Sequence, residues 1–268
     1  MTSFQLHAKI IRNDLLAPGI FRITLNAPEI ASRATPGQFV MVKASDKGNP
    51  LLRRPFSIHQ TTSNGAIQLL IKVLGRGTGY LARQKNGDML EVLGPLGQGF
   101  TLNNQATKVC VVGGGVGVAP LYFLVKELLR IKSAAQIKVL LGSATAKELV
   151  GFNDDFANLG TIPLLATDDG TLGHHGFVTD LLPEELLEED SCQVYACGPK
   201  PMMSKIAKLC AERNRPCQVS LETVMACGIS ACLGCTIKSS QAKMASSGRP
   251  YLHVCKDGPV FNTGDVAW

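Results

Sequence analysis

The chain has 268 residues, of which 45% are hydrophobic and 18% are charged, and its net charge is +6. This composition excludes a disordered chain, and the length is sufficient for two domains and a small third one. The positive charge is spread along the chain without a run of Lys and Arg, which argues against a nucleic-acid-binding protein.

Residues 1–102 read as short strands separated by turns. Strand-forming runs cover 21–25, 39–43 and 67–73, and turn-forming segments occupy 35–38, 63–65 and 86–88. Strands at this spacing favour a small closed antiparallel β-barrel. One short helix is expected over 79–83.

Residues 103–216 show a different pattern, in which strands alternate with helical segments. Residues 109–112 are a continuous apolar run, as expected for a buried parallel strand, and a helical pattern covers 121–131. Further strands are expected at 137–141, 162–166 and 193–196. The alternation predicts a parallel α/β domain.

A glycine-rich turn lies between the 109–112 strand and the following helix, and it contains Gly113, Gly114, Gly115 and Gly117. Backbone N–H groups of such a turn can reach a pyrophosphate, whose charge the helix that follows stabilises. The spacing departs from the G-x-G-x-x-G pattern of dinucleotide-binding turns, so a plain tight turn remains an alternative.

Two motifs in the barrel region are candidates for phosphate binding. Residues 53–57 contain Arg54, which can bind a phosphate through two N–H groups, and Ser57, whose hydroxyl can lie beside a ring nitrogen. Residues 75–79 can form a backbone nest for an anion. Each motif alone is equally compatible with a structural role, but together with the glycine-rich segment 94–100 they form a pattern.

Besides Cys217, residues 217–268 contain four cysteines at a regular spacing, which we call the frame cysteines. Cys227, Cys232 and Cys235 follow the C-x4-C-x2-C spacing, and Cys255 comes later. This is the plant-type [2Fe–2S] ligand pattern, and the small residues between the cysteines suit a loop folded tightly around sulfide. A structural zinc site is an alternative, although such a site usually pairs two short hooks. Chemically inert thiols are a third interpretation.

The cellular compartment bears on these cysteines. No stretch is apolar over a membrane-spanning length, and the N-terminal residues lack the apolar core of a signal peptide. We therefore expect a cytoplasmic protein, in which thiols stay reduced and disulfides are disfavoured. Four other thiols are expected to be small buried side chains, namely Cys110, Cys192, Cys210 and Cys217.

The order of these motifs resembles the ferredoxin–NADP reductase superfamily, with Arg54-Pro55-Phe56-Ser57 in the barrel and Ala196-Cys197-Gly198-Pro199 after a late strand. Segments 225–232 and 254–261 are similar to the electron-transfer subunits of NAD-dependent dihydroorotate dehydrogenases. The resemblance covers essentially the whole chain. It implies an α+β protein with three domains: an antiparallel β-barrel that binds FAD (1–102), a parallel α/β domain that binds NAD (103–216) and a small [2Fe–2S] domain (217–268).

The resemblance also implies site residues. FAD would be held by Arg54, Pro55, Phe56, Ser57, Leu70, Ile71, Lys72, Gly77 and Thr78, and NAD by Gly113, Gly114, Gly115, Gly117, Cys197, Gly198 and Pro199. Many members of the superfamily carry Tyr where Phe56 stands, so one hydroxyl contact to the flavin is absent here. Cys197 would lie beside the nicotinamide, and a buried thiol at the end of a strand is the alternative for it. No residue is a firm catalytic candidate.

The implied function is electron transfer between NADH and a separate, flavin-bearing dihydroorotate dehydrogenase catalytic subunit, in pyrimidine biosynthesis and within a heterotetramer. FAD would convert the two electrons of a hydride into the single electrons that a [2Fe–2S] cluster accepts. One alternative is a related NAD(P)H-linked subunit of a sulfhydrogenase or of a ferredoxin-linked transhydrogenase. Another, from a different class, is a zinc-binding or redox-sensing protein. Trp268 is compatible with a core position or with an interface beside the cluster.

Three smaller features add to these expectations. Residues 142–146 contain no Arg for a 2′-phosphate, although Lys147 follows, and this favours NADH over NADPH. Residues 168–171 are expected to form a loop at the edge of the sheet where ligands bind. His174 and His175 are expected in a surface loop rather than on a metal, because no partners at ligand spacing flank them.

Overall fold

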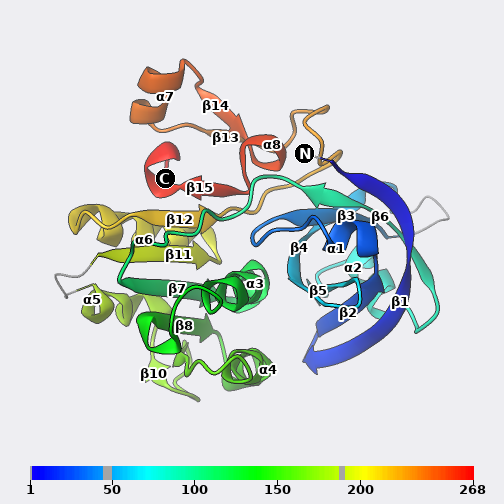
Figure 1. The fold of residues 1–268 in the computed structure, drawn as a ribbon, viewed down its shortest axis with the longest axis horizontal. Helices are drawn as coiled ribbons and strands as arrows, with labels where there is room; N and C mark the ends of the chain where they lie inside the picture. Colours follow the sequence, from blue (N-terminus) through cyan, green and yellow to red (C-terminus); the bar gives the residue numbers. More distant parts are fainter. Residues whose placement is uncertain (1, 45–49, 187–190) are drawn as a thin grey trace.

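The computed structural model describes residues 2–44, 50–186 and 191–268 and shows three parts (Figure 1). A closed six-stranded barrel lies beside a seven-stranded sheet, and the C-terminal segment packs over one edge of that sheet. The predicted fold class of a barrel, a parallel α/β domain and a small C-terminal domain is confirmed. Among the described helices, none combines the length and the apolar character that crossing a membrane requires.

The barrel consists of antiparallel strands in the order β1-β2-β5-β4-β3-β6. Its strands are β1 (Phe4–Ala17), β2 (Ile20–Asn26), β3 (Phe39–Lys43), β4 (Arg53–Thr61), β5 (Ala66–Lys72) and β6 (Met89–Leu96), and its helices are α1 (Pro28–Ala31) and α2 (Arg76–Ala82). Alternate side chains point inward, so that Ile23, Val40 and Ile58 are fully buried in the barrel core.

All three strands predicted in this region are present, as β2, β3 and β5. Closure of the barrel requires β1, β4 and β6 in addition. The residue pattern does not reveal β4, because Pro55 near its start is disfavoured in strands and two charged residues precede it. The predicted short helix is α2, which begins earlier than expected, at Arg76.

The sheet has the order β10-β9-β8-β7-β11-β12-β15 and is parallel except for β15. Its strands are β7 (Lys108–Gly114), β8 (Ile137–Ser143), β9 (Leu164–Thr167), β10 (His174–His175), β11 (Cys192–Cys197), β12 (Cys217–Ser220) and β15 (Val260–Asn262). Its helices and turns are η1 (Gly115–Val118), α3 (Ala119–Leu128), η2 (Ala134–Gln136), α4 (Ala146–Ala157), η3 (Val178–Asp180), α5 (Leu182–Glu185) and α6 (Lys200–Glu212). Helices α3 and α4 lie on the side of the sheet that faces the barrel (Figure 1).

Three details of this domain differ from the prediction. The strand expected at 162–166 begins only at Leu164, because Pro163 has no N–H group to donate to the ladder. The helix expected over 121–131 begins at Ala119, before Pro120, and ends at Leu128. His174 and His175 are exposed, but they form the two-residue edge strand β10 instead of a loop.

The C-terminal segment is tied to the nucleotide-binding sheet by two of its strands. It contains β13 (Thr236–Lys238), α7 (Gln241–Ser247), β14 (Tyr251–His253), α8 (Val254–Asp257) and the turn η4 (Thr263–Asp265), in addition to β12 and β15. Strand β12 pairs with β11, and β15 returns to pair with β12. The domain limits of 1–102, 103–216 and 217–268 remain a prediction.

The four thiols expected in the core are buried there, which confirms that prediction. Cys110, Cys192, Cys210 and Cys217 are each 4% exposed or less. Trp268 is 37% exposed and lines a surface groove with Ser204 and Ala207 of α6, and its indole N–H donates to the carbonyl of Thr263 at 2.9 Å. It therefore does not fill the core.

Candidate functional site

A cavity of about 240 Å³ lies between the barrel and the sheet, and most of the residues expected to hold FAD line it. From that set it contains Arg54, Pro55, Phe56, Ser57, Leu70, Lys72 and Thr78. Ile71 and Gly77 do not line it. Successive side chains of β5 point to opposite faces, and Ile71 is buried in the barrel core. Gly77 lies behind Arg54. The sequence motif marks the strand, and the pleat decides which of its side chains reach the cavity.

Arg54 is oriented by the backbone beside it. Its Nη1 donates to the carbonyls of Leu52 and Arg53 at 2.8 and 3.3 Å. Its Nε and Nη2 hydrogens have no protein partner among the described residues. A methyl group built on Gly77 would lie 3.3 Å from Nε, so Arg54 and Gly77 are neighbours although 23 positions separate them in sequence. A held guanidinium with unused donors suits a phosphate ligand.

A second groove of about 630 Å³ continues from the first cavity at Leu74, which lines both. Its lining includes Arg76, Tyr80 and Arg83. Thr78 holds the connecting loop, since its hydroxyl accepts hydrogen bonds from the N–H groups of Leu74 and Gly75 at 3.0 and 3.2 Å. Arg54 and Lys72 line the first space, and Arg76 and Arg83 line the second. Four basic side chains along two adjoining spaces fit a dinucleotide such as FAD.

The far wall of the flavin cavity was not anticipated from the sequence. Ser220, Leu221, Glu222, Thr223 and Met225, which follow or end β12, line it. The signal available in the sequence was their position directly after a strand of a parallel sheet, since ligands bind at the carboxyl ends of such strands.

A cavity of about 580 Å³ lies at the carboxyl ends of β7, β8 and β9 and matches the place expected for NAD. Gly114, Gly115 and Pro199 line it. Gly115 has a φ of 53°, and a methyl group there would meet nothing within 4 Å. At Gly117 a methyl group would lie 2.6 Å from the carbonyl oxygen of Cys197. Gly117 is therefore needed for the close packing of the turn against the end of β11. Gly115 leaves the backbone of the turn open to a ligand.

Gly113 and Gly198 also allow close packing around this cavity without lining it. A methyl group on Gly113 would lie 3.2 Å from Leu121 and Leu141, and one on Gly198 would lie 2.5 Å from Met202. Both glycines therefore let the walls of the cavity approach each other.

Cys197 is the last residue of β11 and is 1% exposed. Its thiol lines neither cavity, and burial raises its pKa strongly. Its register partner on β12 is Ser220, which does line the flavin cavity. The structure therefore places Cys197 one strand away from the flavin cavity, as a buried thiol at a strand end.

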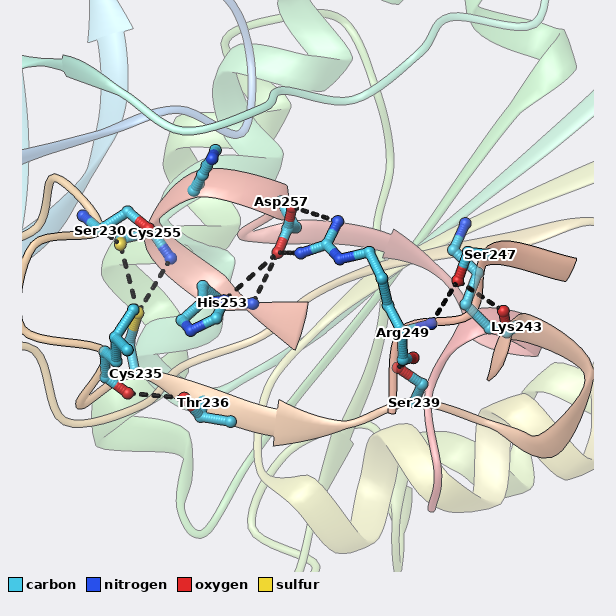
Figure 2. Close-up of polar contacts among 12 residues, drawn as sticks. Ser230, Cys235, Thr236, Ser239, Lys243, Ser247, Arg249, His253, Cys255 and Asp257 are labelled. Carbon is cyan, nitrogen blue, oxygen red and sulfur yellow. Dashed lines mark hydrogen bonds and ion pairs between the residues drawn. The ribbon is translucent and has the colours of Figure 1, made fainter. Parts of the chain in front are cut away.

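The four frame cysteines lie together as two pairs. The sulfurs of Cys235 and Cys255 are 3.2 Å apart (Figure 2). The second pair is Cys227 and Cys232. The sulfur of Cys227 accepts a hydrogen bond from the backbone N–H of Cys232 at 3.4 Å. In the described part of the chain no three His, Cys, Asp or Glu side chains converge as ligands of one ion would. In a [2Fe–2S] cluster each iron takes two protein thiolates, so two pairs fit its ligand pattern.

Backbone N–H groups point at these sulfurs. Ser230 donates to Cys255 at 3.1 Å, and Ile229 donates to Cys227 at 3.4 Å. Burial tends to raise the pKa of Cys227, but the N–H groups of Ile229 and Cys232 outweigh it and lower that pKa to about 7. The loop thus favours the thiolate of Cys227, which is the form that binds iron. Burial and the neighbouring Cys235 thiol instead raise the pKa of Cys255 to about 12.

This loop adopts a backbone shape that few residues tolerate. Ser230 and Leu233 have φ values of 65° and 57°, in the left-handed region. At Gly228, where φ is 74°, a methyl group would lie 2.5 Å from Met41 of β3. Gly228 therefore seats the loop against the barrel, close to the flavin cavity that Met225 lines.

Asp257 holds the segment that carries Cys255 (Figure 2). Its carboxylate accepts two hydrogen bonds from Arg249, at 3.0 and 2.7 Å, and one from the N–H of His253 at 2.7 Å. These bonds close the turn of α8 over β14 and orient the fourth cysteine.

Comparison with known proteins was made against family models and individual relatives. Three models match in succession: an oxidoreductase FAD-binding domain over 8–100, an oxidoreductase NAD-binding domain over 111–208, and the iron-sulfur cluster binding domain of dihydroorotate dehydrogenase B over 222–267. The dihydroorotate dehydrogenase B (NAD(+)) electron transfer subunit of Desulforamulus reducens is 41% identical over 262 residues, which are 97% of each chain. That of Bacillus caldolyticus is 40% identical over 255 residues, or 94% of each chain.

A solved structure has the same architecture. It is that of an NADH-dependent reduced ferredoxin-NADP oxidoreductase, studied for flavin-based electron bifurcation. Its TM-score is 0.85 at 30% identity, and the match covers 97% of this chain and 90% of that one.

Proposed function

The chain belongs to the family of dihydroorotate dehydrogenase B (NAD(+)) electron transfer subunits. On that premise we propose that it carries electrons between NADH and a dihydroorotate dehydrogenase catalytic subunit, through FAD and a [2Fe–2S] cluster. One observation carries this proposal: the three sites adjoin in that order. Lys72 lines both the NAD and the flavin cavities, and Met225 lines the flavin cavity two positions before Cys227.

The residues that line the flavin cavity indicate what the protein contributes to electron transfer. Arg54 and Thr78 would hold the phosphate end of FAD, and Ser57, Leu70 and Lys72 would lie around its ring. Bound FAD supplies the exchange between two-electron and one-electron chemistry that a nicotinamide and an iron–sulfur cluster need. The chain itself supplies position and exclusion of water, and no acid–base pair is required. The zinc-binding alternative loses support, since the matching C-terminal family is described as iron-sulfur binding.

The surface around the cluster loop suits a protein partner. Val224, Ile229 and Leu233 are 83%, 55% and 56% exposed, and Cys232 is exposed among them. Exposed apolar side chains grouped in this way mark an interaction site. We propose that the catalytic subunit docks on this face, in a heterotetramer, and that electrons leave the cluster there.

The isolated chain is expected to oxidise NADH with artificial acceptors and to show no dihydroorotate–orotate activity, because the pyrimidine is expected to bind to the separate catalytic subunit. Addition of the flavin-bearing catalytic subunit should produce orotate-linked NADH turnover. Both activities can be followed spectrophotometrically with purified proteins. Dihydroorotate turnover by the isolated chain would contradict the relay. Turnover with reduced ferredoxin and NADP in place of the catalytic subunit would favour the transhydrogenase alternative.

Coenzyme choice is expected to favour NADH, because the carboxylate of Asp168 lines the NAD cavity without a side-chain partner among the described residues. The two cavity lysines are engaged, Lys72 with Glu148 at 3.3 Å and Lys205 with Asp180 at 2.7 Å. A 2′-phosphate would meet an uncompensated negative charge. Asp168→Ser should raise kcat/KM for NADPH by about tenfold.

The matched control for this prediction is Asp169→Ser. The carboxylate of Asp169 accepts hydrogen bonds from the N–H and hydroxyl of Thr171 at 3.0 and 2.6 Å, and it does not line the cavity. Asp169→Ser should leave the ratio of kcat/KM for NADH to kcat/KM for NADPH unchanged. Equal kcat/KM of the unaltered protein for NADH and NADPH would refute the assignment.

A further inference from the structure

A buried polar group joins the barrel to the α/β domain, away from any motif noted in the sequence. Arg22 of β2 donates to the Asp155 carboxylate of α4 at 2.8 Å. His59 of β4 lies beside the same carboxylate, with 3.8 Å between Nε2 and Oδ2. His59 is 1% exposed and Asp155 is 9% exposed. The three side chains come from three elements of two domains.

His59 also holds the backbone of α3. Its Nδ1 lies 3.0 Å from the carbonyl oxygen of Ala119. A carbonyl can only accept, so Nδ1 carries a hydrogen, and Nε2 faces the Asp155 carboxylate from beyond hydrogen-bond distance. The ring stacks on Tyr122 of the same helix, with centroids 4.6 Å apart. His59 is thus held against α3 through both its edge and its face.

This contact lies where the two coenzyme sites meet. His59 follows Ser57, which lines the flavin cavity, by two positions on β4. Ala119 lines the same cavity and follows Gly117 of the NAD turn by two positions. The hydrogen bond from His59 to Ala119 therefore connects the strand that carries the flavin to the turn that receives the nicotinamide dinucleotide.

Stability of the fold alone does not require the buried polar cluster of Arg22, Asp155 and His59. Burial of charges costs solvation energy, and apolar residues of similar size often stabilise a core equally well. Burial tends to raise the pKa of Asp155, but its interactions with His59 and Arg22 hold the pKa below the usual range. The carboxylate is therefore charged. The hydrogen bonds from Arg22 to Asp155 and from His59 to Ala119 are directional and define one relative position of the two domains, which apolar packing alone would not do.

We propose that Arg22, Asp155 and His59 are positioning residues that fix β4 relative to the NAD turn, and so set the approach of nicotinamide to flavin. The inference rests on the proposed function, because it presupposes that NADH reduces the bound flavin. Transfer between two bound groups is sensitive to displacements on the order of 1 Å. Loss of the charged contact should therefore slow flavin reduction on the order of 10- to 100-fold, with a small change in NADH affinity.

The test uses the FAD-loaded full chain with Asp155→Asn, His59→Leu and His59→Asn. Stopped-flow absorbance measures the rate of flavin reduction at saturating NADH, per bound FAD. Hydrogen–deuterium exchange of residues 113–123, measured on the same proteins without NADH, reports the hold on the NAD turn independently of activity. Asp155→Asn and His59→Leu should slow reduction and accelerate exchange. His59→Asn should restore much of both, because its amide can donate to the Ala119 carbonyl in place of Nδ1.

Glu127→Gln is the matched control, since Glu127 lies on α3, which His59 contacts, and the change removes only its surface ion pair with Arg130. It should leave both readouts unchanged. If Asp155→Asn does not fold, the comparison of His59→Leu with His59→Asn still decides. Wild-type reduction rates in the folded variants, with only a lower melting temperature, would overturn the positioning role. Failure of the unaltered protein to be reduced by NADH would instead refute the proposed function.

Discussion

Replacement of any one of the four frame cysteines by Ala is expected to remove the cluster iron while FAD stays bound. The change applies singly to Cys227, Cys232, Cys235 and Cys255. Each pair of sulfurs would ligate one iron, so the loss of one thiolate would leave that iron with an incomplete ligand set. The flavin cavity is lined by other residues and stays intact. Metal analysis together with flavin absorbance of each purified variant measures both effects.

The functional consequence should be a nearly complete loss of orotate-linked turnover with the catalytic subunit, while NADH oxidation with artificial acceptors largely persists. Cys210→Ala is the control, because that thiol is also buried but lies in the core of the sheet. It should keep its iron. Full iron content after loss of a frame cysteine would remove that residue from the ligand set.

The second large effect is expected for FAD affinity. Arg54→Ala should cost about 1.5–3 kcal/mol, which weakens FAD binding roughly 10- to 150-fold. The reason is that Arg54 is held by two backbone carbonyls and keeps unused N–H donors at the flavin cavity. Equilibrium titration of the apoprotein with FAD, followed by flavin fluorescence, gives the dissociation constant.

Arg33→Ala provides the comparison for Arg54, since Arg33 is exposed on the barrel and lines neither flavin space. It should change the net charge equally and leave FAD affinity unaltered. A loss of affinity of the same size in both variants would show that charge alone, and not the position of Arg54, governs binding.

Several features of this protein could be predicted from the sequence because they depend on local chemistry. Ligand spacing is a property of one short segment, so the cysteine frame could be read without coordinates. The same holds for the glycine turn after β7 and for the change from barrel strands to alternating strands and helices, which reflects two periods of hydrophobic residues. These patterns were sufficient for the fold class and for the order of the three sites.

Other features were decided only by tertiary structure, because they depend on which distant segments meet. The pleat of β5 sends Leu70 and Lys72 into the flavin cavity and Ile71 into the barrel core. The residues after β12 became a wall of that cavity because β12 pairs with β11, and no local signal specifies that pairing.

The contact between the domains has the same origin. Asp155 lies 133 positions from Arg22, and only the packing of α4 against the barrel brings the carboxylate to the guanidinium and to His59. In sequence each of these residues looks like an ordinary surface charge or a lone histidine. Their role follows from burial. An unpaired buried charge costs a large solvation free energy, so each charge needs a partner, and here the partners come from distant parts of the chain.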